Sequence, residues 1–153
     1  MRQQFLRLLM FDLWCTRKLA DVLRVNTEFK ERPACIAFLS HIVAAQNIWY
    51  SRVLDIDPDG YDTWPEYEPE ELKPIAKEYH QKWMDLVADH DIELDTKIHY
   101  QNSKGTPYSN TISDIVSHMI IHGQHHRAQI SLLLRRSDIE PPPIDYIFYT
   151  RQV

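Results

Sequence analysis

The chain has 153 residues, a length that suits one well-packed domain and is short for two. Its 22 acidic residues exceed its 17 basic ones without any basic cluster, which argues against a nucleic-acid-binding protein. No apolar run approaches the roughly 20 residues that a membrane span needs. We therefore expect a single domain over residues 1–153 that has neither nucleic acid nor membrane as a partner.

The N-terminal segment shows apolar residues at a helical period, which predicts a first helix over residues 3–25. Charged residues interrupt this segment and follow it, so it does not resemble a cleavable signal sequence. Cys15 and Cys35 are embedded in apolar helical patterns, as small packing residues of a reducing compartment are. We expect a cytoplasmic protein without a disulfide framework.

Three further helices follow from the pattern of apolar residues. One covers residues 33–54, and the next begins between residues 69 and 74 and continues to about 87. The last covers residues 111–136, and it opens with Thr111 followed three residues later by Asp114, which resembles a capping box. Only three glycines occur in the chain, a number too small for a sheet protein built on tight turns.

The connections between these helices are long. Residues 55–68 form a loop, whereas residues 92–110 alternate around the turn Ser103-Lys104-Gly105 and could form a β-hairpin. The aromatic tail over residues 141–152 is expected to pack back on the helices. The sequence therefore predicts an all-α four-helix bundle with long connections and a small hairpin between the third and fourth helices.

Histidines concentrate on the predicted fourth helix. At about 100° per residue, His122 and His126 fall on the centre line of its apolar stripe, whereas His118 and His125 lie to one side. Burying an unsatisfied polar ring costs roughly 1 to 3 kcal/mol, and one metal ion could satisfy both central rings. Hydrogen bonds to core or rim neighbours are the alternative. Gly123 replaces the glutamate of helical zinc-protease motifs, which argues against that mechanism.

Three motifs together resemble the DinB-like (YfiT-like) metal-binding helical bundle family. They are HxxxHxxxHRxQ on the last long helix, a single histidine early in the second helix and a terminal PPxxDYIFY segment. The resemblance implies a four-helix bundle whose metal ligands are His41, His122 and His126. The position of His41 near the edge of its own stripe does not indicate this role, so that ligand depends on the resemblance. Ala128 departs from the usual glycine, a change that a helix tolerates.

A metal site made of three histidines would allow the bound ion to activate a small ligand. Three neutral imidazoles leave coordination positions open on one divalent ion, with zinc or nickel expected first and iron or manganese also compatible. Such an ion lowers the pKa of a water or thiol that it binds, so the chain could be a metal-dependent hydrolase or thiol transferase. The family resemblance includes thiol-dependent transferases and isomerases. A non-catalytic metal-binding or structural module is the alternative.

The neighbours of this site have open roles. His118 and His125 could support the ligands or contact a substrate, or they could be hydrogen-bonded surface residues. Arg127 could grip an anionic group, but an ion pair with an acidic neighbour is the favoured role. No acidic residue falls in helical register with the ligands, so no general acid or base is identified. A low-molecular-weight thiol or another small molecule would be the substrate.

The partner expected from the family is a second copy of the chain. The first helix carries four apolar residues outside its core-facing stripe: Leu6, Leu8, Met10 and Phe11. This surplus apolar surface also favours a homodimer. Three tryptophans are expected in the core: Trp14, Trp49 and Trp83. The long loop carries Trp64, Tyr61 and Tyr67, which either line a pocket mouth or anchor the loop. Three histidines receive no role: His80, His90 and His99.

Overall fold

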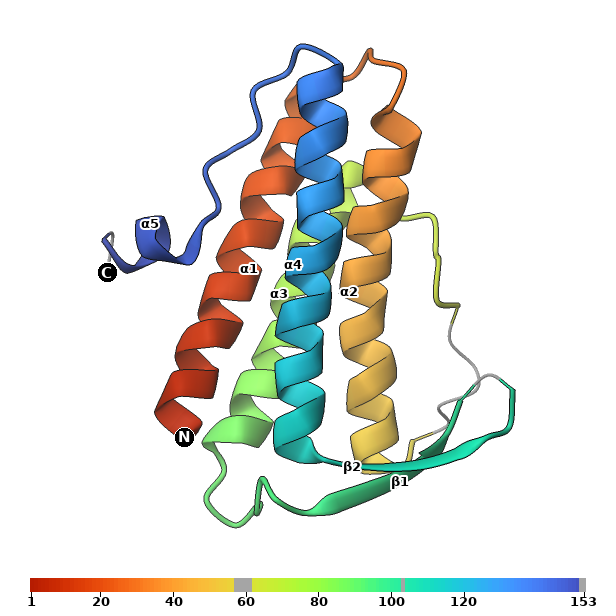
Figure 1. Cartoon of the computed structure of the whole chain (residues 1–153), viewed down its shortest axis with the longest axis vertical. Helices are drawn as coiled ribbons and strands as arrows, with labels where there is room; N and C mark the ends of the chain where they lie inside the picture. The colour runs from red at the N-terminus through yellow and green to blue at the C-terminus, as the bar shows by residue number, and fades with distance from the viewer. Residues whose placement is uncertain (57–61, 103, 152–153) are drawn as a thin grey trace.

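The computed structural model of the chain describes residues 1–56, 62–102 and 104–151. Four long helices run side by side, and a two-stranded hairpin crosses one end of them (Figure 1). The elements in chain order are α1 (Arg2–Val25), α2 (Arg32–Leu54), α3 (Pro69–Ala88), β1 (Lys97–Gln101), β2 (Pro107–Thr111), α4 (Ile112–Arg136) and α5 (Tyr146–Thr150). The predicted all-α bundle with a small hairpin is confirmed. Tyr61 and Ser103, to which the sequence assigned a loop and a turn, lie outside the described residues.

The capping box predicted at the start of α4 is present. The Thr111 hydroxyl accepts a hydrogen bond from the Asp114 amide at 3.0 Å, and the Asp114 carboxylate accepts one from the Thr111 amide at 3.1 Å. Helix α3 begins with the same reciprocal arrangement between Glu68 and Glu71, two residues that the sequence pattern did not single out. Both boxes satisfy amides that a helix start leaves without a partner, and they fix where these helices begin.

Local hydrogen bonds set the turn of the hairpin. Strands β1 and β2 pair antiparallel, with Tyr100 opposite Tyr108. The Asn102 side chain accepts hydrogen bonds from the amides of Lys104 and Thr106, both at 2.9 Å. Gly105 has a φ of +76°, a conformation that residues with a Cβ rarely adopt. The turn chemistry therefore holds the hairpin across the end of the bundle, next to α2 and α4.

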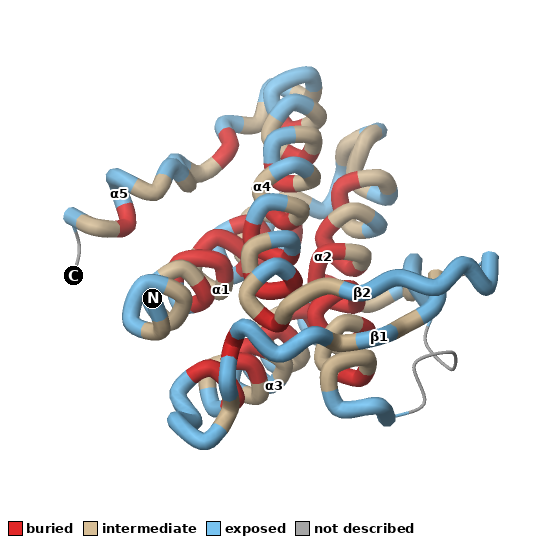
Figure 2. Tube along the Cα trace, turned by 60° about the horizontal axis from the view of Figure 1, so that its bottom comes forward, coloured by how far each residue is buried: buried red, intermediate tan, exposed pale blue. Residues whose placement is uncertain are grey.

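Two large apolar clusters lie along the bundle axis, and a third, smaller one lies between α1 and the C-terminal segment. Buried residues face the interior on all four long helices (Figure 2). One cluster gathers around Leu23, Leu39 and Leu134, and the other around Trp83, Ile115 and Val116. Between the two large clusters, a buried polar layer includes a side chain from each long helix, namely Asp12, Gln46, His80 and Arg127. The bundle is therefore apolar at both ends of its core and polar in the middle.

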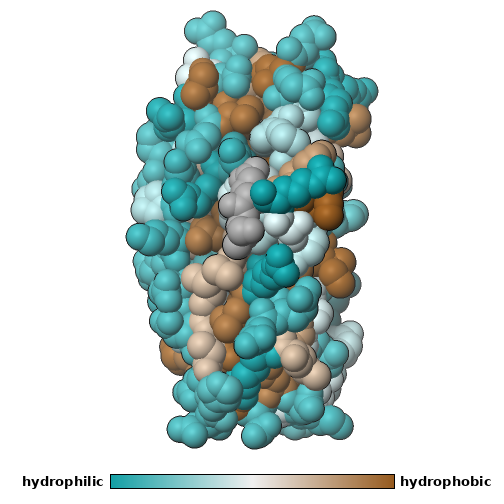
Figure 3. Space-filling view, turned by 90° about the vertical axis from the view of Figure 1, so that its left-hand side faces the viewer, coloured by the Kyte–Doolittle hydropathy of each residue, from teal (hydrophilic) through white to brown (hydrophobic). Residues whose placement is uncertain are grey.

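The C-terminal segment packs on α1, as the sequence predicts. The Phe11 ring lies 5.1 Å from that of Tyr146 and 5.7 Å from that of Tyr149, measured between centroids. Phe11 is consequently buried by its own chain and is unavailable to a partner, contrary to the expectation from sequence. Met10 remains 44% exposed, and hydrophobic residues on this face are scattered among hydrophilic ones (Figure 3). The surplus apolar surface of α1 is smaller than the sequence suggests.

The tryptophans are less uniformly buried than predicted. Trp83 is fully buried and donates from its indole nitrogen to the Gln46 carbonyl at 2.9 Å. Trp14 and Trp49 are only half-buried, because they lie at the bundle surface beneath the C-terminal segment and the hairpin respectively. Of the described helices, none combines the length and apolar character needed to cross a membrane.

Candidate metal centre

Helices α2 and α4 lie next to each other along the bundle (Figure 1), and they bring three histidines together. The Nε2 atom of His122 lies 3.1 Å from that of His41 and 3.2 Å from that of His126. His122 and His126 are one helical turn apart on α4, so the local periodicity of the helix aligns their rings. His41 comes from the facing side of α2 and completes the group.

The donor set fits one metal ion. The three Nε2 atoms are close enough to ligate together, and the group contains no carboxylate or thiol. Tetrahedral zinc with Zn–N bonds of about 2.0–2.1 Å separates neighbouring ligand nitrogens by about 3.3–3.4 Å. The observed separations of 3.1 and 3.2 Å are near this value. The three imidazoles are therefore spaced so that they could hold one ion together.

Two acceptor oxygens determine which ring nitrogen is available. The Nδ1 of His41 lies 2.5 Å from the carbonyl oxygen of Thr63, and that of His126 lies 2.6 Å from Oε1 of Gln129. Because both oxygens only accept, each Nδ1 must carry the proton, which leaves the lone pair on Nε2. Partners of this kind orient metal-binding histidines and raise their basicity. Sequence reasoning missed both, although Gln129 follows His126 by three residues in the HRxQ motif.

Aromatic rings pack against two of the three imidazoles. Trp64 stacks on His41, with centroids 4.0 Å apart, and Phe38 stacks on His126 at 5.4 Å. Trp64 is itself 47% exposed and borders a cavity of about 590 Å³ near the start of α2. It therefore both anchors its loop and lines a pocket, the two alternatives that the sequence left open. Tyr67 lines the same cavity.

Electrostatics keep the central histidines neutral. Burial and the neighbouring imidazoles, His126 first among them, together lower the pKa of His122 to about 4. Burial also lowers the pKa of His126 and outweighs the opposing effect of its hydrogen bond to Gln129. Neutral imidazole is the form that binds a metal, so both rings are in the competent state at neutral pH.

The comparisons with known proteins point to one family. The model of the DinB family matches residues 14–152, which is most of the chain. The chain belongs to the DinB family. It is also 26% identical over 82 residues to Protein DinB of Bacillus subtilis (strain 168), an alignment that covers 54% of this chain. The aligned part is 47% of that relative's length. No solved structure gives a significant match.

Of the other residues that the sequence singled out in this DinB-family chain, His118 and His125 lie beside the triad. The His118 ring is 5.4 Å from that of His122, and the His125 ring is 5.1 Å from that of His126. Both side chains are exposed at the surface. His118 also contacts the ring of Trp49 at 5.3 Å, so it connects the triad to the aromatic residues under the hairpin.

Arg127 faces away from the triad and into the core. Its guanidinium pairs with the Asp12 carboxylate, and its Nε donates to Gln124 at 2.8 Å. The ion pair with an acidic neighbour, favoured from sequence, is confirmed. A Cβ on Gly123 would come within 2.6 Å of Arg127 and 2.9 Å of Asp12, which explains the glycine at this position.

The polar layer around Asp12 was not predicted. His80 Nε2 and Gln46 Nε2 each lie 2.9 Å from the same Asp12 oxygen. Burial raises the pKa of Asp12, but the adjacent Arg127 and the hydrogen bond with His80 outweigh this and leave it lowered. The available signal was a polar residue within an apolar stripe on each helix. This signal does not identify the layer, because the residues that meet Asp12 are far apart in the sequence.

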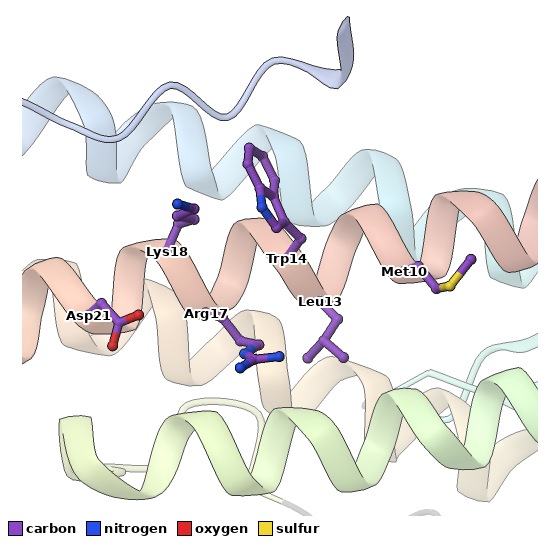
Figure 4. A pocket seen from close by; sticks show the side chains of 6 residues that line it. All are labelled: Met10, Leu13, Trp14, Arg17, Lys18 and Asp21. Atoms are coloured by element: carbon purple, nitrogen blue, oxygen red, sulfur yellow. The ribbon is translucent and has the colours of Figure 1, made fainter. Parts of the chain in front are cut away.

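A cavity on α1 lies away from the triad. It measures about 330 Å³, and the side chains that line it all come from α1 (Figure 4). The lining includes Trp14 beneath the Lys18 ammonium, which is 5.6 Å from the ring centroid. No histidine or cysteine lines this cavity, so it offers no ligand for a soft or borderline metal ion.

Proposed function

We propose that this chain is a metal-dependent enzyme that binds one divalent ion through Nε2 of His41, His122 and His126. The observation that carries the proposal is the convergence of these three nitrogens, two of which have the opposite ring nitrogen tied to an acceptor. Zinc or nickel suits three imidazoles best, and iron and manganese are compatible with them. Cytoplasmic location remains part of the expectation from sequence.

Three protein ligands are fewer than these ions normally take, which is typical of catalytic and not of structural sites. When bound, the ion would supply Lewis acidity and make a coordinated water or small thiol easier to deprotonate. The protein's contribution is to hold the ligand rings: Thr63 and Gln129 fix two of them, and Trp64 packs on one. The reaction class is hydrolysis or the transfer of a low-molecular-weight thiol to an electrophile.

The cysteines of the chain do not supply the nucleophile. Burial raises the pKa of Cys15 to about 12 and that of Cys35 to about 11. Thiols with such values are almost entirely protonated at neutral pH, and the protonated thiol is a poor nucleophile. Any nucleophile must therefore be brought to the histidine site from solution.

A non-catalytic module, in which the ion only joins α2 and α4, is the second candidate. The packing of the bundle argues against this role. Helices α2 and α4 already meet through the apolar clusters, and the Asp12 layer ties Gln46 of α2 to Arg127 of α4. An ion is not needed to hold these helices together, so a catalytic use explains the site better.

The test starts from protein purified without a nickel column, whose metal content is measured by mass spectrometry. The loaded protein is then assayed for conjugation of several small thiols to a panel of electrophiles and for hydrolysis of ester substrates. We expect near-stoichiometric metal and turnover that is lost on chelation and in His126→Ala. Stoichiometric metal without turnover on any substrate would favour the non-catalytic module. Absence of bound metal after titration with zinc and nickel would contradict both candidates.

A further inference from the structure

A third cavity lies under the hairpin, beside the histidine triad. It measures about 190 Å³ and lies where α2, the two strands and the first turns of α4 meet. The residues that line it are Trp49, Tyr100, Asn110, Asp114, Ile115 and His118. Trp49 comes from α2 and the other residues come from the consecutive elements β1, β2 and α4, so the cavity forms where the hairpin crosses the end of the bundle.

The walls of this cavity are aromatic. The Trp49 ring meets the Tyr100 ring at 83° with centroids 5.1 Å apart, and it meets the His118 ring at 69° and 5.3 Å. A planar ring placed among them can stack on one face and present its edge to another, the two geometries that aromatic pairs prefer. A cavity of about 150 Å³ accommodates benzene. The size therefore matches one six-membered ring with a small substituent.

The cavity has a carboxylate in its wall and a guanidinium beside its aromatic rings. The Arg52 guanidinium lies over the rings of Trp49 and Tyr100, at 4.6 and 5.2 Å from their centroids. The Asp114 carboxylate supplies the opposite charge on the α4 side. The Tyr100 hydroxyl donates to Asn110 at 2.8 Å, so these polar groups are engaged in the wall. An uncharged ring suits this environment better than an ion.

His118 connects the cavity to the triad. Its ring contacts Trp49 on one side and lies 5.4 Å from the His122 ring on the other. His118 makes no hydrogen bond to any residue that the structure describes, so its ring nitrogens can serve a ligand. A molecule seated in the cavity would be separated from the triad by one imidazole.

We propose that this cavity binds a single uncharged aromatic ring of the substrate and presents the substituent on that ring toward the histidine triad. The substrate class is thus a monocyclic aromatic compound, and the ring is the part that remains unchanged. The cavity supplies recognition, while the triad supplies the reacting centre, so the direction of presentation depends on the function proposed above. Binding of the ring itself depends only on the cavity.

The first test uses phenol and cyclohexanol, two probes of similar size of which only one is aromatic. Each is titrated into the full chain in the presence of EDTA, followed by two-dimensional NMR. We expect phenol to bind at least fivefold more tightly than cyclohexanol. The resonances that shift should include the Trp49 indole N–H and the amides of Tyr100 and His118. Equal affinity for both probes, or shifts confined to other regions, would overturn the proposal.

Variants separate the wall of the cavity from the rest of the fold. Tyr100→Leu removes a ring from a half-exposed strand position and should weaken phenol binding about threefold or more. Tyr100→Phe keeps the ring and should retain binding, whereas Trp14→Leu, on the α1 face, should change nothing. Tyr100→Leu could lose the hairpin altogether. In that case the proposal is judged by two other results: the affinity of Tyr100→Phe relative to the parent, and the NMR shifts that map the binding site. Unchanged affinity in a folded Tyr100→Leu would contradict the proposal.

A second measurement tests the direction of presentation. Phenol is added to cobalt-loaded protein, and the pseudocontact shifts of its protons are compared with those in His122→Ala. We expect shifts in the parent that disappear in the variant, while the affinity for phenol stays the same. Phenol binding without metal binding would support the proposal that the cavity binds an aromatic ring and would contradict the proposed metal-dependent function. Metal binding with no phenol binding would leave the proposed function and remove the cavity proposal.

Discussion

The indole of Trp64 lies flat on the imidazole of His41, with ring centroids 4.0 Å apart and planes inclined by 7°. The residue before it, Thr63, accepts the hydrogen bond from Nδ1 of the same histidine. One short segment of the long loop therefore controls both the tautomer and the orientation of His41. This histidine was also the ligand that helical periodicity could not identify.

Replacing Trp64 should loosen that ligand. We expect Trp64→Ala to weaken divalent-metal affinity about three- to tenfold, because losing a supporting contact costs less than losing a ligand. Trp64→Phe should keep most of the affinity, since it preserves a stacked ring. Calorimetric titration of zinc into metal-free protein measures the effect, with Trp14→Ala as the control. Equal affinities in Trp64→Ala and the parent would show that stacking does not position His41.

The ligands themselves should have larger effects. His122→Ala should reduce metal affinity at least about tenfold, because it removes the ring whose Nε2 lies next to both other ligand nitrogens. His90→Ala is the matched control, since His90 is exposed and lies in the turn after α3, outside the triad. Metal content after gel filtration distinguishes the two variants. The same content in both would refute the assignment of the triad.

The stability of the metal-free protein should fall between pH 6.5 and about pH 4. The pKa of His122 is lowered to about 4 in the folded chain, so below 6.5 the unfolded chain binds a proton that the folded chain does not. Unfolding then becomes easier until the folded imidazole is protonated as well. Urea unfolding with EDTA at pH 7 and pH 5 measures the loss. His122→Ala should show a smaller loss, and an identical loss would argue against a lowered pKa.

The double variant Cys15→Ala, Cys35→Ala should keep its metal and most of its turnover. Both thiols are buried and protonated, so their removal affects packing but not the reacting groups. Thermal unfolding would report the packing cost separately from activity. If the double variant is folded and fully metallated but inactive, a cysteine and not a metal-bound group is the nucleophile.

A homodimer remains a prediction, and it now depends on fewer residues. Phe11 is covered by the chain's own C-terminal segment, which leaves Met10 as the strongly exposed apolar residue among the four considered on α1. We expect light scattering at micromolar concentration to give twice the chain mass, and Met10→Glu to shift the species toward the monomer. A monomeric mass for the parent would contradict the prediction.

Sequence and structure agree where the signal is local. Periodicity located the four helices, the Thr111–Asp114 pair marked the start of α4, and the stripe position identified His122 and His126. Features that depend on distant partners could not be predicted in the same way. Trp64 reaches His41 through loop docking, and Asp12 meets its partners only after all four helices have packed. A pattern within one segment can show that a polar residue interrupts an apolar stripe, but it cannot show which distant residue that side chain meets.

The Asp12 layer also fixes the positions of the four helices relative to one another along the bundle axis. One carboxylate contacts a side chain from each of the other three long helices, so sliding one helix by a turn would break a buried contact. Where that contact pairs charges, the loss costs about 3–5 kcal/mol. Arg127 directly follows His126, and Gln46 lies five residues after His41. The same layer therefore also fixes the positions of His126 and His41 along the bundle axis. We expect the core to preorganise the spacing of the three nitrogens, so that ions whose preferred geometry does not match it are selected against.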